Sequence, residues 1–223
     1  MSISKFPRIA HVPFSEGAIN EDKIEPKYWK LIKNTTVTIS EKLDGSNTCI
    51  TAEGIYARSH GRIADHRSYD FLKAKFPVWQ RYLKQHRYHV FGEYLFAVHS
   101  IIYEYLPAYF FIFAVRDDNL WLGRKQIEVV AQDLALPCVP VIAQFDLSFM
   151  TKNQFEKQVI NYSNQPSLFG TTREGIVIWP TDDMSISEFS QRVFKWVRKD
   201  HVQTDQHWSH KWKKAELYSD LDL

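Results

Sequence analysis

The sequence predicts an α+β fold built around antiparallel strands. Short β-branched or alternating segments, typical of strands, are interspersed with longer segments whose apolar residues recur at helical spacing. Helices stand between groups of strands instead of following every strand, and this order favours antiparallel over parallel sheets. No stretch rich in proline, glycine and serine divides the 223 residues, so we expect one main domain.

The elements follow from local patterns. Pro26 can begin a short helix, the run Thr36-Val37-Thr38-Ile39 is β-branched, and the apolar side chains of residues 69–83 fall on one side of a helix. The expected strands lie at residues 36–39, 48–52, 55–58, 88–96, 109–115, 175–179 and 192–197. The expected helices lie at residues 26–33, 69–83, 124–135 and 152–162.

Composition excludes several classes of protein. The chain is 15% aromatic, which a disordered chain would not be, and its 28 basic residues nearly balance its 26 acidic ones. A nucleic-acid partner is therefore neither required nor excluded by net charge. The apolar run 108–115 is too short to cross a bilayer, and residues 1–8 lack a signal-peptide pattern. With Cys49 and Cys138 far apart, we expect reduced thiols and a cytoplasmic protein without a membrane partner.

Lys42 is the first candidate for chemistry. It lies in the segment Glu41-Lys42-Leu43-Asp44-Gly45, between two expected strands. Glycine lets a ligand approach the backbone closely, and a loop lysine becomes a nucleophile when nearby cations or a metal lower its pKa. The alternative is an ordinary hairpin in which Asp-Gly is simply good turn chemistry.

Charged and aromatic residues punctuate the later strands. Arg58 could bind a phosphate or belong to a solvated basic loop. Glu93 interrupts an apolar strand, so it either faces solvent or needs a partner such as a ribose hydroxyl, a metal or an arginine. Phe111 and Phe113 share one strand face by alternation, and one ring could stack on a nucleobase or fill the core.

Two more charged residues complete the pattern. Glu174 precedes an apolar strand and suits a metal ion, and Lys195 lies within the last strand and suits a phosphate. Together these clusters supply what a nucleotide such as ATP requires. Their order from Glu41 to Lys199 resembles motifs I, Ia, III, IIIa, IV and V of the covalent nucleotidyltransferases, which comprise DNA ligases, RNA ligases and mRNA capping enzymes.

The resemblance favours RNA ligases. Asn47 stands five places after Lys42, where DNA ligases usually have arginine, and this is similar to ligases like the second RNA ligase of bacteriophage T4. Residues 6–13 also resemble the opening of bacterial RNA-ligase-like sequences. The resemblance implies two antiparallel sheets flanked by helices, with ATP in the cleft between them. It implies ATP and Mg²⁺ or Mn²⁺ as cofactors, and AMP attached covalently to Lys42.

The resemblance assigns a role to each residue that occupies a motif position of the family. The resemblance implies three catalytic residues, namely Lys42 as nucleophile, Glu174 as the metal-facing carboxylate and Lys195 as the α-phosphate contact. The implied cofactor-binding residues are Glu41, Asn47, Arg58, Glu93 at the ribose, Phe113 at adenine, and Lys195. Val197 replaces a second lysine common in motif V, which leaves Arg198 or Lys199 as candidate substitutes. Ala114 stands where motif IIIa often has an acidic residue.

The implied activity is sealing of RNA ends that carry a 5′-phosphate and a 3′-hydroxyl. DNA ligation, a nucleotide-binding RNA adaptor and a protein AMP-transferase remain alternatives. We expect an adenylation domain over residues 1–199 and a short tail over residues 200–223 without an OB domain. The tail either binds RNA or packs onto the body, and a protein partner could replace the missing domain.

Overall fold

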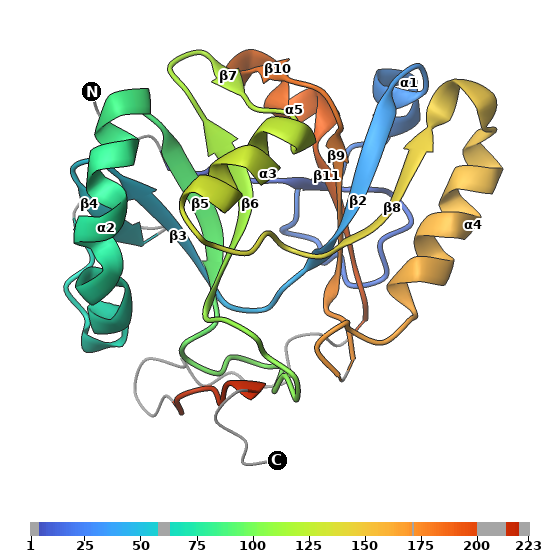
Figure 1. The fold of residues 1–223 in the computed structure, drawn as a ribbon. Coiled ribbons are helices and arrows are strands. Elements are labelled where there is room, and N and C mark those ends of the chain that lie inside the picture. The colour runs from blue at the N-terminus through green and yellow to red at the C-terminus, as the bar shows by residue number, and fades with distance from the viewer. Residues whose placement is uncertain (1–4, 58–62, 171, 200–212, 219–223) are drawn as a thin grey trace.

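Two β-sheets face each other, with helices on their outer surfaces (Figure 1). The computed structural model describes residues 5–57, 63–170, 172–199 and 213–218. The first sheet has the strand order β1-β11-β9-β2-β8, and the second has the order β10-β7-β6-β5-β3-β4. All strand pairs are antiparallel except β1 with β11. The predicted α+β class with two antiparallel sheets is thus confirmed.

The strands are β1 (Ala10–His11), β2 (Thr36–Lys42), β3 (Ser46–Thr51), β4 (Gly54–Ala57), β5 (His89–Tyr94), β6 (Phe110–Arg116), β7 (Leu120–Trp121), β8 (Val141–Asp146), β9 (Gly175–Pro180), β10 (Met184–Ser185) and β11 (Phe194–Val197). The helices are α1 (Tyr28–Ile32), α2 (Asp70–His86), α3 (Arg124–Asp133), α4 (Lys152–Ser163) and α5 (Phe189–Arg192). Strand β8 was not expected from the sequence. It lies at a sheet edge and is only partly buried, so its apolar pattern is weak.

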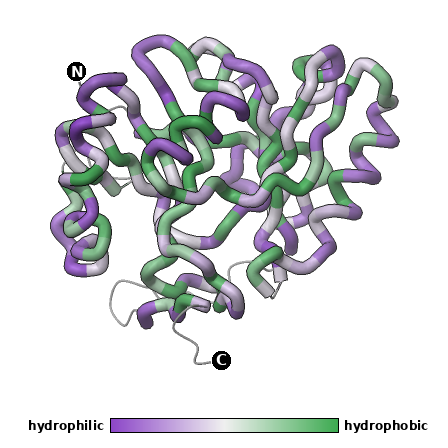
Figure 2. The backbone as a smooth tube through the Cα atoms, in the orientation of Figure 1, coloured by the Kyte–Doolittle hydropathy of each residue, from purple (hydrophilic) through white to green (hydrophobic). Residues whose placement is uncertain are grey.

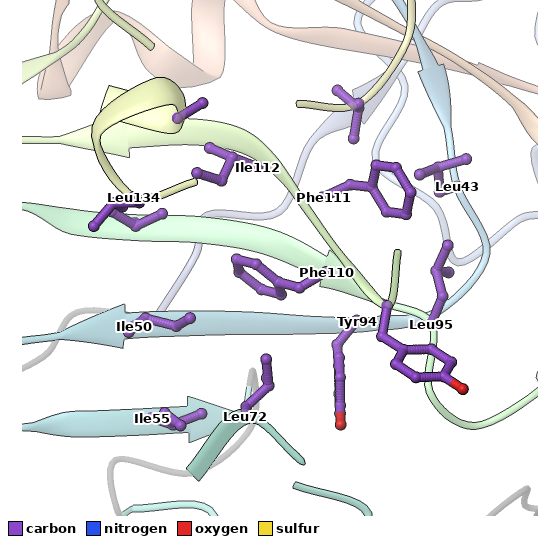
Figure 3. Close-up of a cluster of buried hydrophobic side chains, with 14 of the residues drawn as sticks. Leu43, Ile50, Ile55, Leu72, Tyr94, Leu95, Phe110, Phe111, Ile112 and Leu134 are labelled. Atoms are coloured by element: carbon purple, nitrogen blue, oxygen red, sulfur yellow. The ribbon is translucent and has the colours of Figure 1, made fainter. Parts of the chain in front are cut away.

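Each sheet has its own core. Helices α1 and α4 pack their buried residues, such as Ile32 and Phe155, against β2, β9 and β11. Helices α2 and α3 cover the other sheet, and the buried side chains of Leu72 in α2 and of Leu134, directly after α3, lie near Ile50 and Ile112 (Figure 3). Hydrophobic segments gather where helices meet strands, and hydrophilic ones predominate on the outer helix faces (Figure 2). This packing is what the amphipathic spacing of the helices predicts.

Residues 43–45 carry the chain from one sheet to the other. Strand β2 pairs with β8 and β9, whereas the next strand, β3, pairs with β4 and β5. The segment around Lys42 is therefore a crossing between sheets, and the alternative of an ordinary hairpin is wrong. This crossing places Lys42 where both sheets contribute side chains.

Residues 213–218 lie against the 96–109 connection. The Ala215 amide donates to the Phe96 carbonyl at 2.9 Å, and the Tyr109 hydroxyl donates to the Ala215 carbonyl at 3.1 Å. Ala215 and Leu217 also contact the core of the second sheet. This short segment of the predicted tail packs onto the body. The rest of the predicted tail, residues 200–212 and 219–223, falls outside the described residues. Within the described ranges, none of the helices is long and apolar enough to cross a membrane.

Candidate active site

A cavity of about 900 Å³ lies between the two sheets. Its lining includes Glu41, Lys42, Asn47, Glu93, Phe113 and Lys195, all of which the sequence singled out. Glu174 joins this group through its contact with Lys42. Arg58 lies outside the described residues. The structure thus brings together residues that are up to 154 positions apart in the chain, from Glu41 to Lys195.

Lys42 and Glu174 form an ion pair at the end of two neighbouring strands. Lys42 is the last residue of β2 and stands opposite Gly175, the first residue of β9, so Glu174 lies beside it. The Lys42 Nζ atom is 2.8 Å from both Glu174 Oε1 and Oε2. Burial alone would lower the pKa of Lys42, but the carboxylates of Glu174, Glu93 and Asp44 outweigh it and raise that pKa. Lys42 is therefore an ammonium at neutral pH.

Asp44 anchors the crossing segment to the loop after β5. Its Oδ2 atom accepts hydrogen bonds from the backbone amides of Ser100 at 2.7 Å and Ile101 at 2.9 Å. The Asp44 amide donates to the Tyr103 hydroxyl oxygen at 2.8 Å. These contacts fix the backbone directly after Lys42.

Position 45 requires a glycine because Tyr94 and Leu95 approach its backbone closely. A Cβ atom at this position would lie 2.5 Å from Leu95 Cδ2 and 2.7 Å from the Tyr94 carbonyl oxygen, which no real side chain tolerates. The Gly45 amide donates to Glu93 Oε1 at 3.1 Å. The Asp-Gly sequence after Lys42 is thus explained by packing of β3 against the end of β5.

Glu93 is a carboxyl group whose charge is unfavourable in this site. It points toward the cavity from β5, opposite Asn47 of β3. Its pKa is raised to about 8, first by burial and then by Glu174 and Asp44, with Lys42 acting in the opposite direction. A protonated Glu93 can donate a hydrogen bond, and an ionised one gains from a cation or a hydroxyl donor. Both suit a polar ligand in the cavity.

The two candidate phenylalanines occupy different environments. Phe111 is 1% exposed and packs on Phe169, with ring centroids 5.1 Å apart, and Figure 3 shows it among buried side chains. The register of β5 and β6 shifts so that Phe113 is the extra residue of a bulge. Its half-buried ring lines the cavity and meets Phe6 edge-on at 5.0 Å. Phe113, not Phe111, is therefore available to a ligand.

Glu41 and Lys195 differ in which part of the residue faces the cavity. The Glu41 side chain is fully buried and pairs with Arg173, so only its backbone can reach the cavity. Lys195 lines the cavity from β11, and its charge acts on Asp22 and Glu174. Sequence reasoning gave no role to several lining residues, namely Phe6, Arg8, Asp22, His99, Arg124 and Val177. Apart from the opening at residues 6–13, no local motif marks them.

Two sheets enclose the cavity, and Lys42 stands at the point where the chain passes between them. The chain belongs to the RNA ligase family, whose model matches residues 35–197. Comparison with curated proteins found no match.

Solved structures share the fold. A Naegleria gruberi RNA ligase mutant with ATP and Mn superposes with a TM-score of 0.59 at 16% identity, covering 87% of this chain and 60% of that chain. The same ligase with PPi gives a TM-score of 0.58 at 17% identity, over 89% and 58% of the two chains. Another mutant with AMP and Mn gives 0.56 at 15% identity, over 87% and 57%. The chain thus spans less than two thirds of the length of these ligases.

Proposed function

We propose that this chain is an ATP-dependent RNA ligase that forms a covalent bond between Lys42 Nζ and AMP. The observation that carries the proposal is the position of the Lys42–Glu174 pair. It lies at a cavity that also presents an aromatic ring, Phe113, and a second lysine, Lys195. Membership of the RNA ligase family supports the same activity.

The cavity suits ATP in size and lining. Its volume of about 900 Å³ falls within the range of small-molecule sites. Phe113 and Val177 come from opposite sheets and can hold the adenine, while the backbone of Glu41 lies close by. Glu93 and Asn47 face the position expected for the ribose, and Lys195 can bind the α-phosphate. Arg58 is assigned a phosphate contact from the resemblance alone.

The residues present also fit a divalent metal ion. Within the part of the chain that the structure describes, no three acidic, histidine or cysteine side chains converge. Mg²⁺ usually binds through one or two carboxylates together with water and substrate phosphates, so the carboxylate of Glu174 is sufficient. A divalent cation bound there would screen the phosphate charge and lower the pKa of Lys42 by engaging the carboxylate that now stabilises its proton.

The proposed activity consists of three displacements at phosphorus. Once Lys42 Nζ has lost its proton, it attacks the α-phosphorus of ATP, a P–N bond forms, and the bond to the bridging oxygen breaks to release pyrophosphate. A 5′-phosphate oxygen of the RNA next attacks the same phosphorus, and the P–N bond breaks to return the amine. The 3′-hydroxyl of a second end then attacks the 5′-phosphate, forms the phosphodiester and releases AMP.

The class of acceptor is tested by following the transfer of labelled AMP from the adenylated protein. The protein is incubated with ATP labelled on the α-phosphate and Mg²⁺, desalted, and chased with a 5′-phosphorylated RNA nick, the matching DNA nick, or a protein mixture. We expect label to move to RNA and to leave as AMP when a 3′-hydroxyl is adjacent. Faster transfer to DNA would replace the RNA assignment, and label found on other proteins would indicate an AMP-transferase. Retention on Lys42 with every acceptor would contradict ligation.

A further inference from the structure

A second ion pair lies directly behind the Lys42–Glu174 pair. Glu41 precedes Lys42 in β2, and Arg173 precedes Glu174 in the two residues directly before β9. Because successive strand residues point to opposite faces, Lys42 faces the cavity while Glu41 faces the interior. Glu41 Oε2 lies 3.5 Å from Arg173 Nε. The end of β2 and the residues before β9 are therefore joined by two ion pairs. In the first pair β2 supplies the cation, and in the second it supplies the anion.

Arg173 connects three segments of the first sheet and its covering helix. Its guanidinium donates to the carbonyl of Tyr162, near the end of α4, and to the carbonyl of Pro166 at 3.0 Å. Glu41 Oε2 also accepts from the Leu168 amide at 3.2 Å. The side chains of Arg173 and Glu41 are 3% and 0% exposed. This network ties the connection between α4 and β9 to the strand that carries Lys42.

Such a buried pair is a poor source of stability. Desolvating two charges offsets most of their attraction, and hydrophobic replacement of both partners is often neutral or stabilising. Among the described residues, Glu41 Oε1 and Arg173 Nε are both buried without a hydrogen-bond partner, so the 3.5 Å contact is an ion pair and not a hydrogen bond. What Arg173 does provide is direction, because the outer nitrogens of its rigid guanidinium donate to the carbonyls of Tyr162 and Pro166 while its charge faces Glu41.

We propose that Arg173 and Glu41 are positioning residues for lysine adenylation, in which their buried ion pair holds Glu174 beside Lys42. This inference rests on the proposed function, since adenylation is the step that the pair would support. Neither side chain contacts the nucleotide, because both are enclosed behind β2. Their loss should therefore lower the rate of the chemical step and leave ATP binding nearly intact.

The test uses the double variant Glu41→Leu/Arg173→Met, which removes both charges and keeps apolar volume. Adenylation is measured as the single-turnover rate at saturating ATP, together with the KM for ATP and the melting temperature. We expect the rate to fall by about tenfold or more, because small displacements of reacting groups cost up to about 100-fold. The KM should change by less than about twofold and the protein should remain folded. The single variant Glu41→Gln should also lower the adenylation rate without changing the KM for ATP, but by a smaller factor.

A matched control is Glu188→Gln, which removes the partner of Arg192 in an ion pair on α5. It should leave the adenylation rate unchanged. A folded double variant that adenylates as fast as the wild type would overturn the positioning role.

A second measurement, made without nucleotide, distinguishes failure of this inference from failure of the proposed function. It compares the chemical reactivity of the Lys42 amine in the two proteins. An amine-reactive reagent should modify Lys42 faster in the double variant than in the wild type, relative to exposed Lys84. Equal reactivity would contradict the inference whether or not the wild type uses ATP.

Discussion

Lys42 Nζ donates a hydrogen bond to Glu174 Oε2 at 2.8 Å and lies 2.8 Å from Oε1 of the same carboxylate, across the ends of two paired strands. The contact keeps the side chain in place and, at the same time, keeps it protonated. A lysine must be neutral to act as a nucleophile. The pair thus describes a resting state, and adenylation requires the carboxylate to be engaged by something other than the lysine.

The variant Glu174→Gln tests this resting state. Removing the carboxylate charge should lower the pKa of Lys42, because Glu174 is the strongest of the groups that raise it. At pH about 8 and without nucleotide, an amine-reactive reagent should therefore modify Lys42 several times faster in this variant. Peptide mass spectrometry measures the modification, and exposed Lys84 provides the internal control. Slower or unchanged modification of Lys42 would mean that Glu174 does not control its protonation.

The two phenylalanines of β6 should separate binding from stability. Phe113→Ala should weaken ATP binding by about 1–3 kcal/mol, the value of one base-stacking contact. Phe111→Ala should instead lower the free energy of unfolding by about 3–5 kcal/mol, because its ring is buried in the core. ATP titration and denaturant unfolding of both variants measure the two effects. If Phe111→Ala weakened ATP binding and Phe113→Ala did not, the assignment of the stacking ring would be wrong.

Glu93 should make the protein less stable as pH rises. Its pKa in the folded protein is about 8, above the ordinary value of 4.5, so the folded state holds a proton that the unfolded state has lost. The free energy of unfolding should therefore fall as pH increases from about 4.5 to about 8. Glu93→Gln should remove this loss and be more stable than the wild type by about 1 kcal/mol or more near pH 9, with little difference near pH 4.

Denaturant unfolding at several pH values checks the prediction. The contrasting control is Glu188→Gln. The pKa of Glu188 is lowered, chiefly by the hydrogen bond from the Ser185 amide, so its charge stabilises the fold above its ordinary pKa. That variant should lose stability at neutral pH. A Glu93→Gln protein that is less stable than the wild type at high pH would show that the ionised carboxylate is favourable in the site.

The sequence predicted the elements and the order of the site residues better than their contacts. Lys42, Asn47, Glu93 and Lys195, each singled out at a strand end or within a strand, line one cavity, and their roles there stay predictions. The opposite orientation of Glu41 follows from strand alternation, but its pairing with Arg173 does not, since that contact joins segments 132 positions apart. The bulge that exposes Phe113 depends on the register with β5, which no local pattern encodes.

The C-terminal segment should support the active site. Residues 213–218 pack on the 96–109 connection, and the same connection supplies the Ser100 and Ile101 amides that hold Asp44. Deleting residues 213–223 should lower the melting temperature by several degrees and reduce adenylation and sealing in the same proportion. Deleting only 219–223 is the control and should retain both. If the longer deletion abolished sealing but spared adenylation, the segment would be an RNA contact instead.

The most direct measurement of the central claim is the site of AMP attachment. The wild-type protein is incubated with ATP and Mg²⁺, digested, and examined by mass spectrometry, alongside Lys42→Arg, which keeps the charge but not the nucleophile, and Lys195→Arg. We predict one AMP adduct on the peptide that contains Lys42, no adduct in Lys42→Arg, and a slower reaction at the same residue in Lys195→Arg. An adduct on another residue, or one that persists in Lys42→Arg, would contradict the assignment of Lys42 as the nucleophile.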